Sequence, residues 1–560
     1  MNLLWASWLP FRARDGSVAY RPPSAIADPD IVDLALPRAD FQGAAYQWLI
    51  GLLQSALVPK DHDEWLDRFA DPPVGEALET SFTPFSAAFA LDGEGPRFMQ
   101  DLDPLAETEP ATVAGLLIDS PGANGVKNNT DLFVKRGRVD TICPDCAALA
   151  LFTMQVNAPA GGAGIRVGLR GGGPLTTLVL PDDAEASLWQ RLWLNVLPLA
   201  SITRRGQESA APRADDATLF PWMGTTRISD RMGTEVLPEQ MHPLHPYWSM
   251  PRRFRLLVED SFCRCDLCGR ESQRSVREIR ARKQGINYAG PWQHPLTPYR
   301  RDPKKPQEPP LSLKGQPGGL GYRHWSHLVL EDPKNSGSLP AGVVHDYLHG
   351  KAPANRLARQ WGDDIKALLS HARLWAFGYD LDKMKPRAWY AVEMPLVAVS
   401  PEQQETLRAW VQSFTELARQ VAWTVRNQVK AAWFARPGDA KGDMSPIDSQ
   451  FYDATEPNFF RALFDMQVAL QQGEGPHVPS RVAKAWYQAL KFEALRLFDD
   501  QSLSGPPVEL DMKRVIRARR HLLAWLAGGK GGTVVKNFAE EGGFPLTAAQ
   551  EATPTEEVAP

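Results

Sequence analysis

The sequence has few cysteines, no long apolar run and no marked excess of either charge. Only five of its 560 residues are cysteine, and no stretch approaches the ~18 uncharged apolar residues of a membrane-spanning helix. Residues 1–12 contain no basic leader ahead of an apolar run, so no secretory signal is expected. Lysine and arginine (62) nearly balance aspartate and glutamate (66), and 43% of the residues are hydrophobic, which excludes disorder of the whole chain. We therefore expect a cytoplasmic protein without membrane contact, built from two to four domains of about 150 residues each.

The sequence also lacks the common catalytic motifs. It contains no GxSxG nucleophile elbow and no GxxxxGK[ST] phosphate loop. His345 and His349 stand at positions i and i+4, but the glutamate that a zinc protease needs in HExxH is absent. A metal-dependent phosphohydrolase centred on His345 and Asp346 stays open as an alternative, although it needs further ligands that the sequence does not identify. Five other histidines neighbour prolines or aromatic residues and are expected to be packed or to cap turns: His242, His245, His294, His324 and His327.

Proline and glycine divide the chain into regions of different character. Residues 1–390 mix short apolar runs with many turns, which is typical of a mixed α/β domain. Residues 303–319, with five prolines, three lysines and three glycines, are expected to be a linker or exposed loop. Four amphipathic patterns between residues 400 and 530 predict a four-helix bundle. Residues 531–560, which start glycine-rich and end acidic, are expected to be a disordered tail. The predicted fold class is α+β: a large mixed α/β domain followed by a helical bundle.

The helical region carries its own start and stop signals. Ser400, Pro401 and Gln403 suit a helix N-terminus. Seven apolar residues then recur at three- and four-residue steps, which places them on one helical face: Leu407, Trp410, Val411, Phe414, Leu417, Val421 and Val425. Pro437 and Gly438 end this helix. Three further helices are predicted, near residues 457–472, 480–499 and 508–527.

All five cysteines fall in two clusters. Cys143 and Cys146 form one CxxC pair, Cys265 and Cys268 form another, and Cys263 stands one step outside that spacing. Two such knuckles suit a tetrahedral Cys₄ zinc site, which is closed to water and therefore structural. A redox CxxC and scattered buried thiols are the alternatives, but a redox motif does not require a second pair. The 118 residues between the pairs imply an ion that joins two remote segments, with Cys263 either spare or an alternative ligand.

Positive charge and glycine gather near these clusters. The stretch from Arg252 to Lys305 contains fourteen Lys and Arg but only six Asp and Glu. Six basic residues directly follow the second knuckle: Arg270, Arg274, Arg277, Arg280, Arg282 and Lys283. Residues 159–164 and 168–173 are the most glycine-dense part of the chain. Exposed backbone beside cations suits contact with a nucleic-acid backbone or minor groove. A solvated charged face and a pair of strand-connecting turns explain the same residues as alternatives.

Several segments, in a fixed order, resemble the CasA family. They are the start Met1-Asn2-Leu3-Leu4, the stretch from Asn157 through Gly168-Leu169-Arg170-Gly171-Gly172 to Thr177, the two CxxC knuckles, and Gly290-Pro291-Trp292-Gln293-His294-Pro295. The resemblance covers most of residues 1–379, and the helical region matches in position and type more than in sequence. That family is the large subunit of Cascade, the type I-E CRISPR surveillance complex.

The resemblance implies a DNA-motif sensor without catalytic activity. The family's protein works with the other Cascade subunits and their guide RNA, and it finds the protospacer-adjacent motif (PAM) in double-stranded DNA from the minor groove. It starts duplex opening and R-loop formation, stabilises the displaced strand and helps to recruit the helicase-nuclease. RNA pairing then reads the sequence, while the protein reads a short motif and shape. A purely structural zinc scaffold for a protein complex is a third interpretation.

The resemblance also assigns DNA-contacting residues. The family's glycine loop corresponds to Gly161, Gly162, Ala163 and Gly164, with Ala163 in place of a glycine. Its minor-groove lysine corresponds to Lys283. Its loop toward the guide-bearing subunit corresponds to residues 125–134, where Asn128, Asn129 and Phe133 are the expected contacts.

The family's wedge hairpin, which splits the duplex, corresponds to residues 380–385. Asp382, Lys383 and Met384 stand where glutamine and asparagine are common, so the base contacts of the tip stay open, although Met384 could still unstack a base step. The last helix of the predicted bundle carries five basic residues that either follow the displaced strand or form a solvated face: Lys513, Arg514, Arg517, Arg519 and Arg520.

Overall fold

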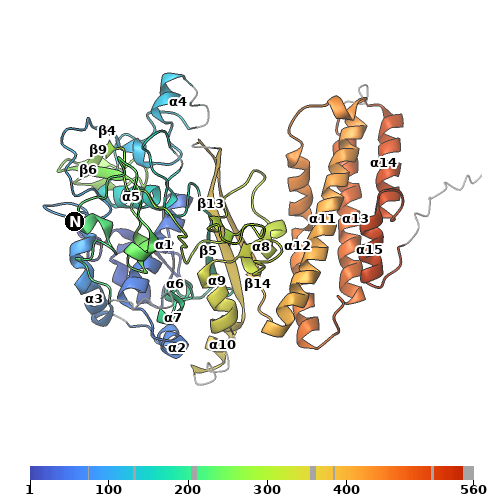
Figure 1. The fold of residues 1–560 in the computed structure, drawn as a ribbon, viewed down its shortest axis with the longest axis horizontal. Helices are drawn as coiled ribbons and strands as arrows, with labels where there is room; N and C mark the ends of the chain where they lie inside the picture. Colours follow the sequence, from blue (N-terminus) through green and yellow to red (C-terminus); the bar gives the residue numbers. More distant parts are fainter. Residues whose placement is uncertain are drawn as a thin grey trace, which may run out of the picture. The chain divides into compact units, whose positions relative to one another are not determined.

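The chain folds into two compact units of different secondary structure. The computed structural model describes residues 1–73, 75–129, 131, 134–159, 161–202, 211–352, 361–382, 385–505 and 510–546. The first unit contains Met1–Pro317 and His327–Leu396, and the second contains Gly318–Ser326 and Val397–Pro560. The first mixes helices and strands and the second is helical, as the sequence predicted (Figure 1). None of the helices in the described ranges is long and apolar enough to cross a membrane.

The first unit contains mostly short helices. They are α1 (Ala39–Ala56), α2 (His62–Ala70), α3 (Glu76–Phe82), α4 (Ala123–Lys127), α5 (Pro144–Asn157), α6 (Leu188–Trp193), α7 (Leu199–Ile202), α9 (Gly342–Asp346) and α10 (Asp363–Ser370). A π-helical turn, Tyr347–Lys351, follows α9, and α8 (Trp325–Val329) begins in the second unit's segment of the chain and ends in the first. Almost every residue of α1 and α5 is buried, because both helices are apolar on most sides and lie inside the unit.

The strands form small antiparallel sheets. Among the described residues, four sheets have three strands and one has two. Their orders are β2-β1-β3 (Val18–Arg21, Leu9–Ala13, Ile31–Leu34), β11-β10-β12 (Leu311–Ser312, Tyr299–Arg300, Ser338–Leu339), β14-β13-β5 (Lys385–Leu396, Ala372–Asp382, Thr176–Pro181), β4-β9-β6 (Ala111–Thr112, Ser275–Arg282, Arg253–Glu259) and β7-β8 (Cys263–Arg264, Glu271–Ser272). The strand pairs β13–β14 and β6–β9 are the longest.

Aromatic rings fill the core of the first unit. The ring of Phe89 lies 5.3–5.7 Å from those of Trp48, Phe98, Phe220 and Trp248, which come from distant parts of the chain. The Phe98 ring is stacked and the other three are edge-to-face, and both arrangements add to the free energy gained by burying the rings. This core supports α1 and α5, and therefore the first cysteine knuckle at the start of α5.

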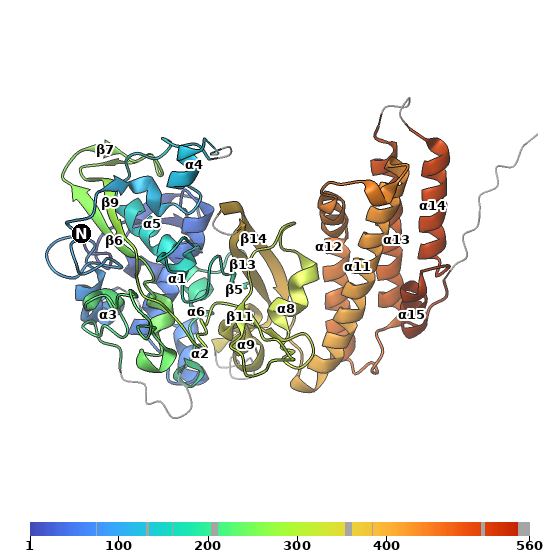
Figure 2. The same cartoon turned by 45° about the horizontal axis from the view of Figure 1, so that its top comes forward.

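The second unit is a bundle built around one long helix. Its helices are α11 (Gln404–Trp433), α12 (Ser445–Gln471), α13 (Ser480–Leu503), α14 (Met512–Leu526) and α15 (Thr533–Glu541). Figures 1 and 2 show the first four side by side, and α11 packs against each of the others. Ser400 and Gln403 form the predicted capping box, with the Ser400 amide donating to Gln403 Oε1 at 3.3 Å, just before α11. All seven residues of the predicted apolar face of α11 are buried.

Two predictions about the helical region are wrong. The second helix does not begin at Pro457: α12 starts at Ser445 and runs through this proline. Proline has no amide hydrogen, so the carbonyl of Asp453 lacks the helical hydrogen bond that residue 457 would otherwise donate. Pro457 and Asp453 are both exposed, so water can bind this carbonyl instead. The region from 531 is not a disordered tail throughout, because Thr533–Glu541 form α15 and bury Val535 and Phe538. Residues 547–560 lie outside the described residues.

One segment from far upstream also belongs to the bundle. The ring of Tyr322 stacks on Phe459 of α12 with centroids 4.5 Å apart, and its hydroxyl lies 2.9 Å from Thr455 Oγ1. The linker predicted at 303–319 therefore leads directly into a short piece, Gly318–Ser326, that is packed within the helical unit.

We expect Phe538→Ala to destabilise the helical unit by about 3 kcal/mol, because it removes a buried ring that packs on Phe414 with centroids 5.2 Å apart. Urea unfolding measures the change. Phe492→Ala is the matched control, since Phe492 on α13 is 65% exposed and its loss should change stability by less than about 0.5 kcal/mol. Equal stability of the two variants would show that α15 is not part of the core.

Candidate functional site

Four cysteines from two remote segments meet at one point. The sulfur atoms of Cys143, Cys146, Cys265 and Cys268 all lie within 4.8 Å of one another, and those of Cys143 and Cys268 are 3.8 Å apart. A tetrahedral ion with metal–sulfur bonds of about 2.3 Å separates its ligands by about 3.8 Å. The donor set and spacing therefore fit a four-thiolate metal site. The part of the chain that the structure describes contains no other group of three or more possible ligands.

Local backbone structure presents each pair of thiols. Cys143 caps the N-terminus of α5, with Pro144 in the first turn, and its sulfur accepts the Cys146 amide at 3.5 Å. The second pair lies in the β7–β8 hairpin, where the Gly269 amide donates to the Cys265 carbonyl at 2.9 Å. Gly269 has φ +72°, a conformation that glycine adopts without strain. Each knuckle thus aims its sulfurs inward.

Contacts outside the sulfurs also join the two knuckles. Asp266 Oδ2 accepts the amides of Asp140 and Thr141 at 2.8 and 2.7 Å, and the Arg270 guanidinium pairs with Asp145 at 2.9 Å. Hydrogen bonds from Cys143 and Cys146 lower the pKa of the Cys268 thiol, whereas hydrogen bonds to the other three thiols raise the pKa of Cys146. Cys263 is not part of the cluster, because its thiol donates to the Arg274 carbonyl at 3.5 Å.

The structure brings the glycine loop, residues 161–164, directly beside Lys283. The Gln284 amide donates to the Gly164 carbonyl at 2.7 Å, and a Cβ added to Gly164 would lie 3.4 Å from that of Lys283. Gly164 and Gln284 both have positive φ, +78° and +65°. Lys283 is exposed, and its ammonium group has no ion-pair partner within the described ranges. Gly162 and Ala163 are exposed at the tip of the loop.

Arg252 closes the glycine loop at its base. Its Nε donates to the Arg166 carbonyl and its Nη2 to the Pro159 carbonyl, both at 2.6 Å, so one side chain ties together the two ends of the loop. The Gln155 side chain of α5 holds the backbone of Arg252: it accepts a hydrogen bond from the Arg252 amide and donates one to the Arg252 carbonyl. Burial lowers the pKa of Arg252 to about 10. The loop is therefore a constrained element.

Arg252 is not among the site residues that the sequence predicts. It stands at the edge of the basic stretch, and its only signal was its place between Pro251 and the apolar pattern of β6. Its hydrogen bonds to two backbone carbonyls far away in the sequence cannot be predicted from the residues around Arg252.

Half of the basic stripe is used for local pairing. Arg270 pairs with Asp145, Arg274 with Asp92 and Asp260, and Arg282 with Asp103. Arg270 also lies over the ring of Tyr20 at 3.5 Å. The solvated-face alternative therefore explains part of this charge. Lys283, at the end of the stripe, differs from these three arginines because it has no ion-pair partner within the described ranges.

The other residues assigned by the resemblance lie on two further elements. Asn128 and Asn129 are exposed after α4, and Asn129 Oδ1 accepts from Arg136 at 2.9 Å. The β13–β14 hairpin stands where the wedge was expected, with Asp382 paired to Lys385 in the register next to its tip. Strand β13 of this hairpin lies against the glycine-rich residues 168–173, since a Cβ added to Gly173 would lie 2.6 Å from Leu381 Cδ1. Phe133, Lys383 and Met384 lie outside the described residues.

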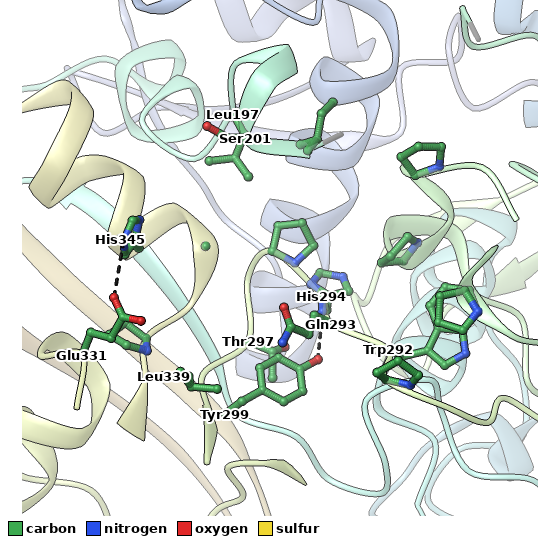
Figure 3. A pocket seen from close by; sticks show the side chains of 18 of the residues that line it. Leu197, Ser201, Trp292, Gln293, His294, Thr297, Tyr299, Glu331, Leu339 and His345 are labelled. Carbon is green, nitrogen blue, oxygen red and sulfur yellow. Dashed lines mark hydrogen bonds and ion pairs between the residues drawn. The ribbon is translucent and has the colours of Figure 1, made fainter. Parts of the chain in front are cut away.

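His345 and Asp346 do not converge on one site. His345 faces a cavity of about 590 Å³ that residues 291–295 also line, and its Nε2 lies 3.5 Å from Glu331 (Figure 3). Asp346 instead binds buried Lys351 at 3.0 Å and His62 at 3.1 Å. Burial raises the pKa of Asp346, but Lys351 and His62 outweigh it, and the pKa falls to about 2. The pair therefore lacks the arrangement that a metal phosphohydrolase would need.

The five histidines that were expected to pack or to cap turns do so. His245 is fully buried, with Nδ1 2.8 Å from the Thr218 carbonyl, and burial lowers its pKa to about 3. His242, His294 and His324 each accept a nearby backbone amide through Nδ1, and His327 bonds Ser338.

Comparison with known proteins gives consistent matches over nearly the whole chain. The model of the family CRISPR-associated protein Cse1 matches residues 2–497. Among solved structures, CasA of Thermus thermophilus is 17% identical with a TM-score of 0.66 and covers 96% of this chain and 99% of its own. Cse1 of Thermobifida fusca is 17% identical with a TM-score of 0.65, covering 97% and 98%. A chain of a CRISPR RNA-guided surveillance complex is 16% identical with a TM-score of 0.61, covering 93% and 99%.

We expect Arg252→Lys to loosen the glycine loop, because an ammonium group cannot span both carbonyls as the planar guanidinium does. Hydrogen exchange at the amides of Ile165 and Gly168, which close the turn, should accelerate by about tenfold. Arg255→Lys is the control, since Arg255 is buried on β6, three residues after Arg252, but donates to the Asp101 carbonyl. Unchanged exchange in Arg252→Lys would mean that the loop holds its shape without this clamp.

Proposed function

The chain belongs to the CRISPR-associated Cse1 family, and from this membership we propose that it is the non-catalytic large subunit of Cascade, a CRISPR RNA-guided surveillance complex. Its partners would be the other subunits with their guide RNA, double-stranded target DNA and a helicase-nuclease that joins after the R-loop forms. It would act in the cytoplasm in antiviral defence. Its own task would be to recognise the PAM and to start opening the duplex.

The observation that carries this proposal is the contact between the glycine loop and the turn at Lys283 and Gln284, which we call the lysine turn. Backbone without side chains can approach a groove closely, and an ammonium group beside it can reach the acceptors on the minor-groove edges of base pairs. The bond from Gln284 to Gly164 sets the distance between these two elements. Because the minor groove distinguishes A·T from T·A poorly, several related motifs should be accepted.

The proposed metal is zinc, held by Cys143, Cys146, Cys265 and Cys268 in a structural site. Four thiolates leave no open position for a substrate, so the ion would act only as a crosslink. It would hold the start of α5 against the β7–β8 hairpin. From this hairpin the chain continues through β9 to Lys283, so the site supports the strand that ends at the lysine turn.

Two further elements suit the steps after recognition. The β13–β14 hairpin is the element proposed to enter the duplex, through residues 382–384, and the loop at 125–134 would contact the guide-bearing subunit. On α14, Lys513, Arg517 and Arg520 are exposed at spacings of four and three residues, so they share one helical face. This face would follow the phosphates of the displaced strand, whereas Arg519 is paired with Asp499 at 2.7 Å.

We expect Lys283→Ala to weaken binding of the assembled complex to motif-bearing duplex DNA by about tenfold, the loss of one charged contact. Binding to a target with the motif region already melted should change far less. Gel shifts at fixed salt measure both, and Lys366→Ala, an exposed lysine on α10, serves as the control. If wild type itself bound duplexes with and without the motif equally, the chain would be a scaffold and not a sensor.

We also expect Cys265→Ser to abolish the binding of about one zinc ion per chain and to lower the unfolding temperature by about 5 °C or more. Elemental analysis and thermal unfolding measure these changes. Cys263→Ser provides a matched control, because this neighbouring buried thiol lies outside the cluster and should leave the zinc content unchanged. Zinc loss in the control alone would reassign the ligand set.

A further inference from the structure

Three loops of the first unit meet at the buried side chain of Ser229. Its Oγ donates to the Gly285 carbonyl at 2.6 Å and accepts the Arg166 Nε at 2.6 Å, and its amide donates to the Gln284 carbonyl at 3.2 Å. Arg166 Nη2 also donates to the Ser229 carbonyl at 2.8 Å. Arg166 lies two residues beyond the glycine loop, and residues 284–285 directly follow Lys283. The segment around Ser229 is therefore attached to both elements of the proposed DNA site.

This third loop, residues 227–233, exposes an apolar tip and two cations. Met232 is 95% exposed and Ile228 is 38% exposed, whereas Ser229 between them is buried. Arg227 and Arg231 are exposed as well, and Asp230 is the one acidic residue of the loop. Thr234 Oγ1 donates to the Arg231 carbonyl at 2.8 Å and closes the turn behind Met232. Met232 contributes little to the fold, because its side chain is almost fully exposed.

Charge favours DNA over a protein as the partner of this loop. Arg227, Arg231 and Lys283 lie on connected turns and exceed the single charge of Asp230, so the surface is attractive to phosphate. Proteins that bind the minor groove commonly add an apolar side chain, methionine among them, that inserts at a base step. The loop offers both features next to the proposed groove-reading elements.

We propose that residues 227–233 form a third DNA-contacting loop, in which Met232 packs against base pairs beside the motif and Arg231 contacts a phosphate. This inference rests on the proposed function, because it assigns a further part of the same duplex site. The contact is separate from the β13–β14 hairpin. It adds apolar burial and one ionic contact to the backbone and lysine readout.

The test compares variants of the full chain within the assembled complex. We expect Met232→Ala to weaken binding to motif-bearing duplex about tenfold, while Met232→Leu, which keeps the apolar volume, stays close to wild type. Arg231→Ala should reduce the slope of log K against log salt by about 1, the signature of one lost phosphate contact. Val18→Ala, an exposed apolar residue on β2, is the control.

The outcomes separate this inference from the proposed function. If Met232→Ala and Arg231→Ala bind like Val18→Ala while Lys283→Ala is impaired, the third loop is not part of the interface and the proposed function stands. If Lys283→Ala also binds like the control, the duplex site itself is misplaced. A defect of Met232→Ala toward duplex, but not toward the pre-melted target, supports the proposed contact.

Discussion

The 2.7 Å hydrogen bond from the Gln284 amide to the Gly164 carbonyl is the contact on which the proposed DNA interface depends. It joins two segments that lie 120 positions apart in the sequence, and both of its residues have positive φ. Arg252 ties the ends of the glycine loop from below, and the four cysteines fix the strand that leads to the lysine turn. For the proposed groove contact the loop would need no rearrangement, so the entropic cost of ordering the loop would fall on folding and not on binding.

Local patterns were sufficient to predict the helical region in outline. The seven-residue apolar face of α11 and the capping box at Ser400 depend only on neighbours within one or two turns. The errors have local causes too. Pro457 was interpreted as a helix start, although buried Ile447 and Phe451 upstream continue the same face into Phe459. The glycines near 530 suggested a tail, but they form only the turn before α15, whose Val535 and Phe538 repeat with helical spacing.

The site was predictable only where residue type itself carries the chemistry. Two CxxC pairs predict a metal site, because few other roles require four thiols at this spacing. The four sulfur atoms come together in the structure as expected. Arg252 and Ser229 were not predictable, because their contacts are to backbone carbonyls of distant segments, and carbonyls are the same in every residue. Three residues that the resemblance assigns to DNA contact, Phe133, Lys383 and Met384, lie outside the described residues.

The separation of the two knuckles also affects the order in which the protein can be made. Cys143 and Cys146 leave the ribosome well before Cys265 and Cys268, so their shared cluster closes only after most of the first unit has been synthesised. Closing so long a loop is entropically expensive unless the aromatic core has already brought its ends together. In the proposed zinc-bound protein the cluster would therefore close only once α5 and the second knuckle lie together, and Lys283, fifteen residues beyond Cys268, is synthesised after the last ligand.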